Sequence, residues 1–278
     1  MFRQKIEDNQ QVELPENWLT HGNPWEFPRP EVSYKVRFGG RVMEYQGPDG
    51  NRHFDWIEGD VVIAQAYDTP IPGFHNDTVN NLRLWSAKAY EDFDLNRFNL
   101  GEYTQAVEDK THSENISKVL YPDDSSTRNK MLRLKQQYFF VSASLKDILR
   151  RFFYDHEDLA ELPDKVAIQL NDTHPAIAVP ELMRLLIDEH GMEWGAAWKI
   201  TEATFAYTNH TLLPEALECW SLPLFGRLLP RHLEIIYRIN ERFLDRVRIW
   251  CMGDHDTVAR MSIIDEQGER SVRMAHLA

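Results

Sequence analysis

The stretch of sequence that decides the fold reads KVAIQLNDTHP, from Lys165 to Pro175. Its first half is a short apolar run, as found in buried parallel strands. From Asn171 the stretch turns polar, and helical periodicity resumes around residues 180–189. Strand, polar loop and helix in this order form the unit of an open α/β sheet, where ligands bind beyond the carboxyl ends of the strands. The stretch therefore predicts an α/β domain with a polar crevice.

The α/β part extends on both sides of this stretch and covers residues 127–278. A long amphipathic helix precedes it, with large apolar side chains at three- and four-residue steps: Met131, Leu134, Tyr138, Val141, Leu145, Ile148 and Phe152. Further helices are predicted over residues 194–205 and 233–247.

The first part of the chain, residues 30–90, is predicted to be rich in β-structure. Residues 41–45 and 52–57 flank a Gly-Pro-Asp-Gly turn and form a hairpin candidate. Residues 61–64 and 82–86 are expected to be further strands.

Residues 94–126 join these two parts. Asp94 is a plausible N-cap, and residues 99–118 are predicted to form a polar helix with only scattered apolar side chains. A polar helix with so little to bury often projects from the body or meets another subunit.

Charge and composition exclude several functional classes. The formal net charge of -13 argues against a nucleic-acid or anionic-membrane partner, because the long-range field would repel either one. The two cysteines, Cys219 and Cys251, have no C-x-x-C spacing, so a disulfide framework is not expected and a reducing compartment fits best. No apolar run reaches the length of a bilayer, and the start lacks the apolar core of a secretory signal. We expect a cytoplasmic protein.

The polar loop has two readings that the residues alone leave open. Asp172 and His174 follow the strand directly, which suits contact with a polar ligand in the crevice. Asp172 or Thr173 could instead cap the next helix by accepting its free N–H groups.

Three other groups suggest chemistry, and each has a simpler interpretation. Asp123 and Asp124 could form a glycosidase pair, but a solvated turn fits better because such pairs need a defined separation across the bond. Arg150 and Arg151 complement the dipole at the end of the long helix, or could hold a phosphate. The histidines match no metal-ligand spacing, so no metal is expected; they are His174, His210, His232 and His276.

Several longer strings resemble the glycogen/starch/maltodextrin (α-1,4-glucan) phosphorylase family, and they occur in family order along essentially the whole chain. They include GNPWE (22–26), YDTP (67–70), LRLWSAK (82–88), ENIS (114–117), LRLKQQYF (132–139), IQLNDTHP (168–175), AYTNHT (206–211), LPEAL (213–217) and LPRH (229–232).

The resemblance implies a GT-B glycosyltransferase, of which this chain corresponds to the latter part of the Rossmann-like N-terminal domain. In the family, inorganic phosphate cleaves a terminal α-1,4 bond of a glucan and releases glucose 1-phosphate. Pyridoxal phosphate takes part through its phosphate group, and its lysine belongs to a C-terminal domain that nothing here resembles. The sequence ends within the apolar run 274–278, which looks like a cut. We therefore expect a fragment that is inactive alone.

The resemblance also assigns site residues. His276 matches the histidine that hydrogen-bonds the glucose, and Asp172 and His174 match residues that line its pocket. The loop from Tyr121 to Ser126, with Asp124, matches the mobile gate over the site. The family pattern has Asn where this chain has Ser125, whose shorter side chain puts the direct sugar contact in doubt, so a bridging water would be needed.

Arg150 and Arg151 match an arginine pair that binds effector phosphates in regulated members of the family. The helix over residues 99–118 matches the one that packs across the homodimer interface. Two rival functions are a related GT-B glucan synthase and a non-catalytic chain that binds carbohydrate or a partner.

Overall fold

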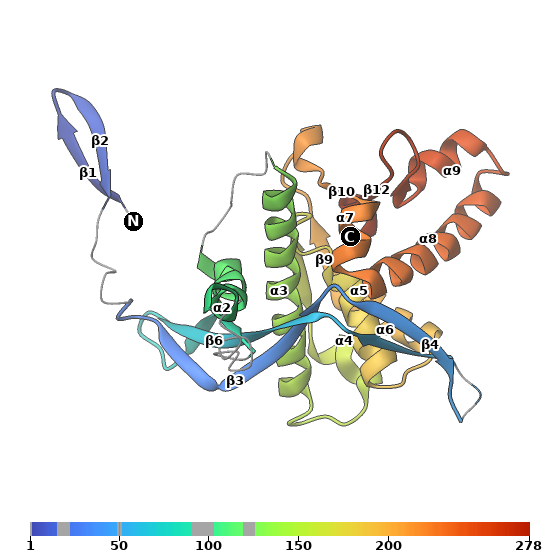
Figure 1. Cartoon of the computed structure of the whole chain (residues 1–278), viewed down its shortest axis with the longest axis horizontal. Coiled ribbons are helices and arrows are strands. Elements are labelled where there is room, and N and C mark those ends of the chain that lie inside the picture. Colours follow the sequence, from blue (N-terminus) through green and yellow to red (C-terminus); the bar gives the residue numbers. More distant parts are fainter. Residues whose placement is uncertain (1, 16–22, 49, 51, 91–102, 119–125) are drawn as a thin grey trace.

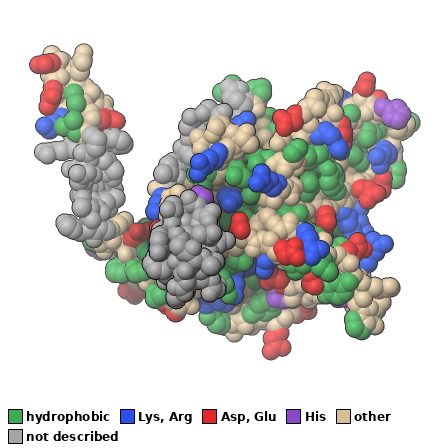
Figure 2. Space-filling view, in the orientation of Figure 1, with side chains coloured by type: hydrophobic (Ala, Val, Ile, Leu, Met, Phe, Trp, Pro, Cys, Tyr) green, Lys and Arg blue, Asp and Glu red, His purple; other side chains and the backbone are tan. Residues whose placement is uncertain are grey.

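The computed structural model of the chain describes residues 2–15, 23–48, 50, 52–90, 103–118 and 126–278. At the start of the chain, β1 (Phe2–Glu7) and β2 (Gln10–Pro15) form an antiparallel hairpin that stands apart from the body (Figure 1), as the space-filling view also shows (Figure 2). None of the described helices combines the length and the apolar run that a bilayer crossing requires.

The predicted β-rich part contains a three-stranded antiparallel sheet and a separate hairpin. The sheet has the order β3 (Phe27–Phe38), β6 (Asp60–Pro72), β7 (Val79–Ala89). Alternate residues of β6 are buried, including Val62, Ala64 and Ala66, because successive side chains of a strand point to opposite faces. The predicted strands at 61–64 and 82–86 are confirmed as parts of β6 and β7.

The predicted hairpin is confirmed as β4 (Arg41–Gln46) and β5 (Arg52–Ile57), paired antiparallel. Gly40 leads from β3 into this hairpin with a φ of 73°. A Cβ atom at this position would collide with the backbone oxygen of Ile57. Only glycine therefore fits here.

Two helices pack against this sheet. α2 (Tyr103–Lys118) lies on β7, where the Ser117 hydroxyl accepts a hydrogen bond from the Ala87 N–H at 3.0 Å. Ile116 is 4% exposed, so the end of this helix is anchored in the body. The residues 94–102, which include the predicted N-cap, lie outside the described residues.

The long predicted helix is confirmed as α3 (Thr127–Phe152), and Ser126 caps it by accepting from the Asn129 N–H. Of the predicted stripe, Met131 and Ile148 are half-buried and the other five side chains are buried. The apolar pattern gave no sign of Asp147, a carboxylate that is 4% exposed on the same helix.

The deciding stretch forms a parallel pair of strands joined through helices. The order is a 3-10 turn (Leu159–Glu161), α4 (Leu162–Lys165), β8 (Ile168–Asn171), α5 (Ala178–Arg184), a π-helical turn (Leu185–Glu189), α6 (Trp194–Thr204) and β9 (Phe205–Thr208). β8 is parallel, as predicted, and its partner β9 is a strand that the sequence analysis did not predict. The predicted burial of β8 is wrong for most of the strand, because only Leu170 is buried. Phe205 opens β9 rather than closing α6, in line with the strand preference of aromatic and β-branched residues.

The last part of the chain adds a small antiparallel sheet and a second long helix. The elements are a 3-10 turn (Pro214–Ala216), β10 (Cys219–Ser221), α7 (Leu222–Leu228), α8 (Pro230–Trp250), α9 (His255–Met261), β11 (Ile264–Asp265), β12 (Ser271–Arg273) and α10 (Met274–Leu277). α8 begins three residues before the predicted start, because Pro230 suits the first position of a helix.

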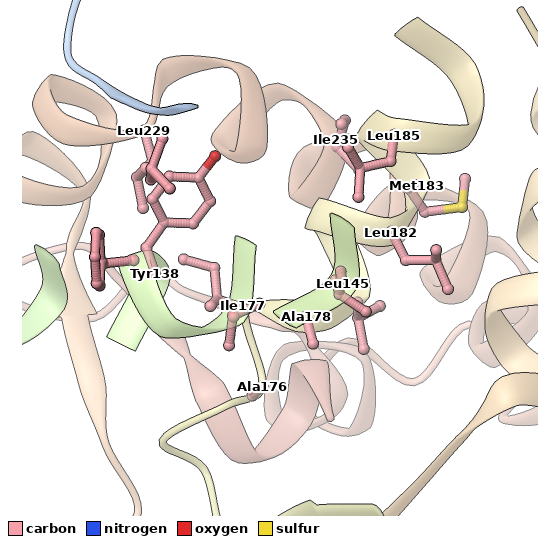
Figure 3. Packing of buried hydrophobic residues seen from close by; sticks show 14 of the residues in the cluster. Tyr138, Leu145, Ala176, Ile177, Ala178, Leu182, Met183, Leu185, Leu229 and Ile235 are labelled. Atoms are coloured by element: carbon pink, nitrogen blue, oxygen red, sulfur yellow. The ribbon is translucent and has the colours of Figure 1, made fainter. Parts of the chain in front are cut away.

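The main core lies where α3, α5 and α8 meet (Figure 3). Tyr138, Ile177, Leu182 and Ile235 are each at most 1% exposed. Burying one such large apolar side chain contributes about 1.5–3 kcal/mol. The mixed α/β class is confirmed, with antiparallel sheets outnumbering the parallel one among the described strands.

Candidate functional site

The carboxyl ends of the parallel strands bring two polar segments together. Asn171 ends β8, and His210 follows β9 by two residues. The His210 Nε2 and the Asn171 Oδ1 are hydrogen-bonded across the gap between the strands. Segments 39 residues apart in the sequence thus form one polar edge, at the place where open α/β sheets bind ligands.

Asp172 holds the loop in a conformation uncommon for a residue with a side chain. Its φ is 71°, which aspartate tolerates better than most residues. The Asp172 N–H donates to the Thr208 carbonyl at 2.8 Å, and the Asp172 carboxylate accepts from the Thr173 N–H at 2.7 Å. α5 begins only at Ala178 and has no side-chain cap. The helix-cap interpretation of Asp172 and Thr173 is therefore wrong.

A group of charged and polar side chains lies beside His174. The Glu218 carboxylate pairs with Arg133 at 3.0 Å and accepts from Gln137 at 3.0 Å and from the Thr173 hydroxyl at 3.3 Å. The Arg133 guanidinium is 3.5 Å from His174 Nε2. Sequence reasoning missed Arg133 and Glu218, because the three segments involved are distant in the chain.

Tyr207 adds a polar atom without a partner. Its hydroxyl is buried and has no hydrogen bond within the described residues. Burial raises the pKa of Tyr207, and the negative charge of Asp172 raises it further. The two side chains therefore interact electrostatically. A neutral phenol hydroxyl can both donate and accept, but this one is buried and faces protein rather than solvent.

His276 does not join this group. Its side chain is exposed, and its Nδ1 is hydrogen-bonded to the Ser262 carbonyl at 3.0 Å, beside Asp265. Its predicted sugar contact stays a prediction. The predicted gate residues Tyr121, Asp124 and Ser125 lie outside the described residues.

Arg150 and Arg151 both pair with Asp147 from their own helix, at 2.9 Å and 3.0 Å. Arg150 also donates to the Tyr34 hydroxyl at 2.7 Å. Burial and the hydrogen bond to Asp147 raise the pKa of Tyr34 to about 12, so this hydroxyl stays protonated. Asp147 thus supplies a counter-charge for both arginines, and their effector-phosphate role stays a prediction.

The most buried charges form a cluster that sequence reasoning missed. Glu181 is fully buried and pairs with Arg184 at 2.7 Å and with His232 Nε2 at 2.6 Å, while the Ser142 hydroxyl donates to it at 2.7 Å. Burial alone would raise the pKa of Glu181, but Arg184 and His232 hold it well below its usual value. This cluster ties α3, α5 and α8 together.

Burial lowers the pKa of His232 below its ordinary value of 6.5, against the opposing effect of Glu181. Below pH 6.5 the unfolded chain therefore binds a proton that the folded chain does not, so stability falls with falling pH. We expect the free energy of unfolding to drop between about pH 7 and about pH 5.5, by at most about 1.4 kcal/mol per pH unit from this group. Urea titrations across this range should show a flatter profile for His232→Phe; an equally steep one would exclude His232 as the source.

No group of three or more potential ligands in the described ranges could hold a metal ion. Two lysines have a pKa lowered by burial, as a cofactor-binding lysine would. However, Lys146 donates to the Lys35 carbonyl at 2.8 Å, and the Lys135 ammonium lies 5.3 Å from the Phe38 ring centroid. Neither fits a pyridoxal phosphate site.

Comparison with known proteins shows the family of the chain. A family model for carbohydrate phosphorylases matches residues 1–278. The chain is 58% identical over its whole length to a glycogen phosphorylase of Synechocystis sp., 53% to the brain form of Homo sapiens and 52% to the liver form of Ovis aries. In each comparison it covers 33% of the relative, so it spans about a third of the length of these proteins.

Proposed function

Because this chain belongs to the carbohydrate phosphorylase family, we propose that it forms the sugar-facing part of an α-1,4-glucan phosphorylase. In this reaction inorganic phosphate releases glucose 1-phosphate from the end of a glucan such as glycogen, starch or maltodextrin. The observation that carries the proposal is the polar edge at the ends of β8 and β9, where Asn171, Asp172 and His210 meet.

The chemistry of this edge suits a sugar. Asp172 offers a carboxylate oxygen beyond the one that accepts from the Thr173 N–H. A neutral imidazole donates at one nitrogen and accepts at the other, which matches a sugar hydroxyl. We propose His174 and His210 as the imidazoles that face the sugar, with the gate residues Tyr121, Asp124 and Ser125 completing the pocket.

The wider architecture belongs to the same proposal. Parallel strands joined through helices are consistent with one half of a GT-B enzyme. Pyridoxal phosphate would supply acid–base chemistry through its phosphate group when bound, and we propose that its lysine lies in the part of the relatives that this chain does not span. We also propose a cytoplasmic homodimer that uses α2 and the residues before it.

Two exposed histidines allow a matched test of the sugar site. In the full-length enzyme, His210→Ala should lower kcat/KM by an amount equivalent to about 1–3 kcal/mol, because a polar sugar group loses its partner. His276→Ala is the comparison, since the structure places this side chain on the Ser262 carbonyl instead.

Steady-state kinetics with glycogen and phosphate decide between the two histidines. A loss confined to His210→Ala supports the strand-end site, and a loss confined to His276→Ala would restore the assignment made from the family resemblance. Unchanged kinetics in both variants would contradict the proposed site. Finding a sugar nucleotide as the donor would favour a glucan synthase instead.

A further inference from the structure

A hollow lies between α6 and α8, and its lining includes none of the strand-end residues. Its volume is about 300 Å³, and aromatic and aliphatic side chains line much of it. Trp194 and Ile239 are each 5% exposed, while Trp198 and Phe243 are half-buried. Three aromatic rings around one small hollow form a surface suited to a flat apolar group.

The indole N–H of Trp194 is buried in this lining without a partner. No hydrogen-bond acceptor reaches its Nε1 within the described part of the chain. Leaving such a donor unsatisfied costs about 1–3 kcal/mol, and native structures seldom leave one so. A ligand with an acceptor group would satisfy it if the lining side chains move aside and expose the N–H.

Positive charge borders the hollow on the α8 side. Arg238, Arg242 and Arg246 are spaced four residues apart and so share one side of the helix. The guanidinium carbons of Arg238 and Arg242 lie 4.1 Å and 5.7 Å from the Trp194 ring centroid. Burial lowers the pKa of Arg238, and repulsion from Arg242 lowers it further.

Carboxylates balance these arginines only in part, with Glu193 attracting Arg238. Among the described residues, no ion pair joins any of the three to a carboxylate. Asp245 also lines the hollow, but it pairs with Arg248 at 2.7 Å. Crowded guanidinium groups without carboxylate partners attract an anion, and Arg binds carboxylate and phosphate in a bidentate manner.

We propose that this hollow binds a small aromatic anion. The rings of Trp198 and Phe243 contact the flat body of the ligand, and Arg242 and Arg246 bind its carboxylate or phosphate. The N–H of Trp194 donates to an acceptor on the ligand once the lining side chains move aside and expose it. A neutral sugar would bring no charge to pair with Arg242 and Arg246, so this site differs in chemistry from the proposed glucan site and does not depend on it.

Fluorine NMR of the full-length protein labelled with fluorotryptophan tests the proposal locally. The signals of Trp194 and Trp198 are assigned from Trp194→Phe and Trp198→Phe. Naphthoate should shift both signals in a saturable manner, and naphthyl phosphate in place of naphthoate shows which anionic group is preferred. Arg242→Gln and Arg246→Gln should each weaken binding roughly tenfold, because one charged contact is lost.

Controls separate this site from non-specific binding. Arg260→Gln removes an exposed arginine on α9 outside the hollow and should leave the affinity unchanged. Acetate lacks the rings and naphthol lacks the anion, so both should bind far more weakly than naphthoate. Fluorine signals that do not move, equal binding of naphthol, or full affinity in Arg242→Gln would each overturn the proposal.

Discussion

A purified protein of these 278 residues should release no glucose 1-phosphate from glycogen, even with phosphate and added pyridoxal phosphate. The reason is chemical: phosphorolysis needs cationic groups that hold the attacking phosphate and a lysine that holds the cofactor. Lys146 is engaged with a backbone carbonyl. Our proposal places the cofactor lysine in the two thirds of the relatives that the chain does not span, since it covers 33% of them.

A coupled assay that converts glucose 1-phosphate into NADPH measures this outcome. The full-length Synechocystis relative, run at equal molar concentration, shows that the assay detects the reaction. A sugar-binding measurement on the same preparation shows that the chain is folded and its strand-end site accessible. Release of glucose 1-phosphate above the blank would refute the expectation and require a complete catalytic site within this chain.

Glu181→Ala should destabilise the protein by about 3–5 kcal/mol, the cost of leaving one partner of a buried ion pair uncompensated. Glu181 is fully buried and Arg184 is 7% exposed, so water cannot replace the lost carboxylate at Arg184. His232 and Ser142 lose a partner as well. Urea denaturation followed by circular dichroism measures the change in the free energy of unfolding.

Glu266→Ala is the matched control, because Glu266 also pairs with an arginine, Arg270, but the two side chains are 62% and 52% exposed. Such surface pairs contribute about 0–1 kcal/mol. Similar small losses in both variants would mean that the buried cluster is not a stabilising unit. Glu181→Gln keeps the volume and should still destabilise strongly, which separates the charge from the cavity.

The periodic elements could be predicted from the sequence because their patterns are local. The stripe of α3 and the alternation in the β4–β5 hairpin each lie within one segment, and the strand–loop–helix unit at residues 165–189 needs only a short window. The predicted helix boundaries differ from the observed ones where a single residue sets them. α8 begins at Pro230, three residues before the predicted start, and Phe205 belongs to β9 instead of α6.

The candidate site was harder to predict because it depends on pairs distant in the chain. Asp172 and His174 stood out beside their strand, but the place of His210 depends on the parallel pairing of β8 with β9. The contact between Arg133 and Glu218 joins residues in different segments, and nothing local marks it. Glu181 lies in an ordinary helical stretch, and only burial reveals its role.

The single carboxylate of Asp147 has partners on β3, on β7 and on α3. A substitution at one of these partners should therefore also change the contacts of the others. Asp147 accepts from Tyr34 of β3, from Arg83 of β7 and from Arg150 at the end of its own helix. Removing any one of these partners lets the others draw closer to the freed oxygen. Energies measured for single substitutions here should therefore fail to add. The β3–β6–β7 sheet and the end of α3 are therefore coupled through one carboxylate.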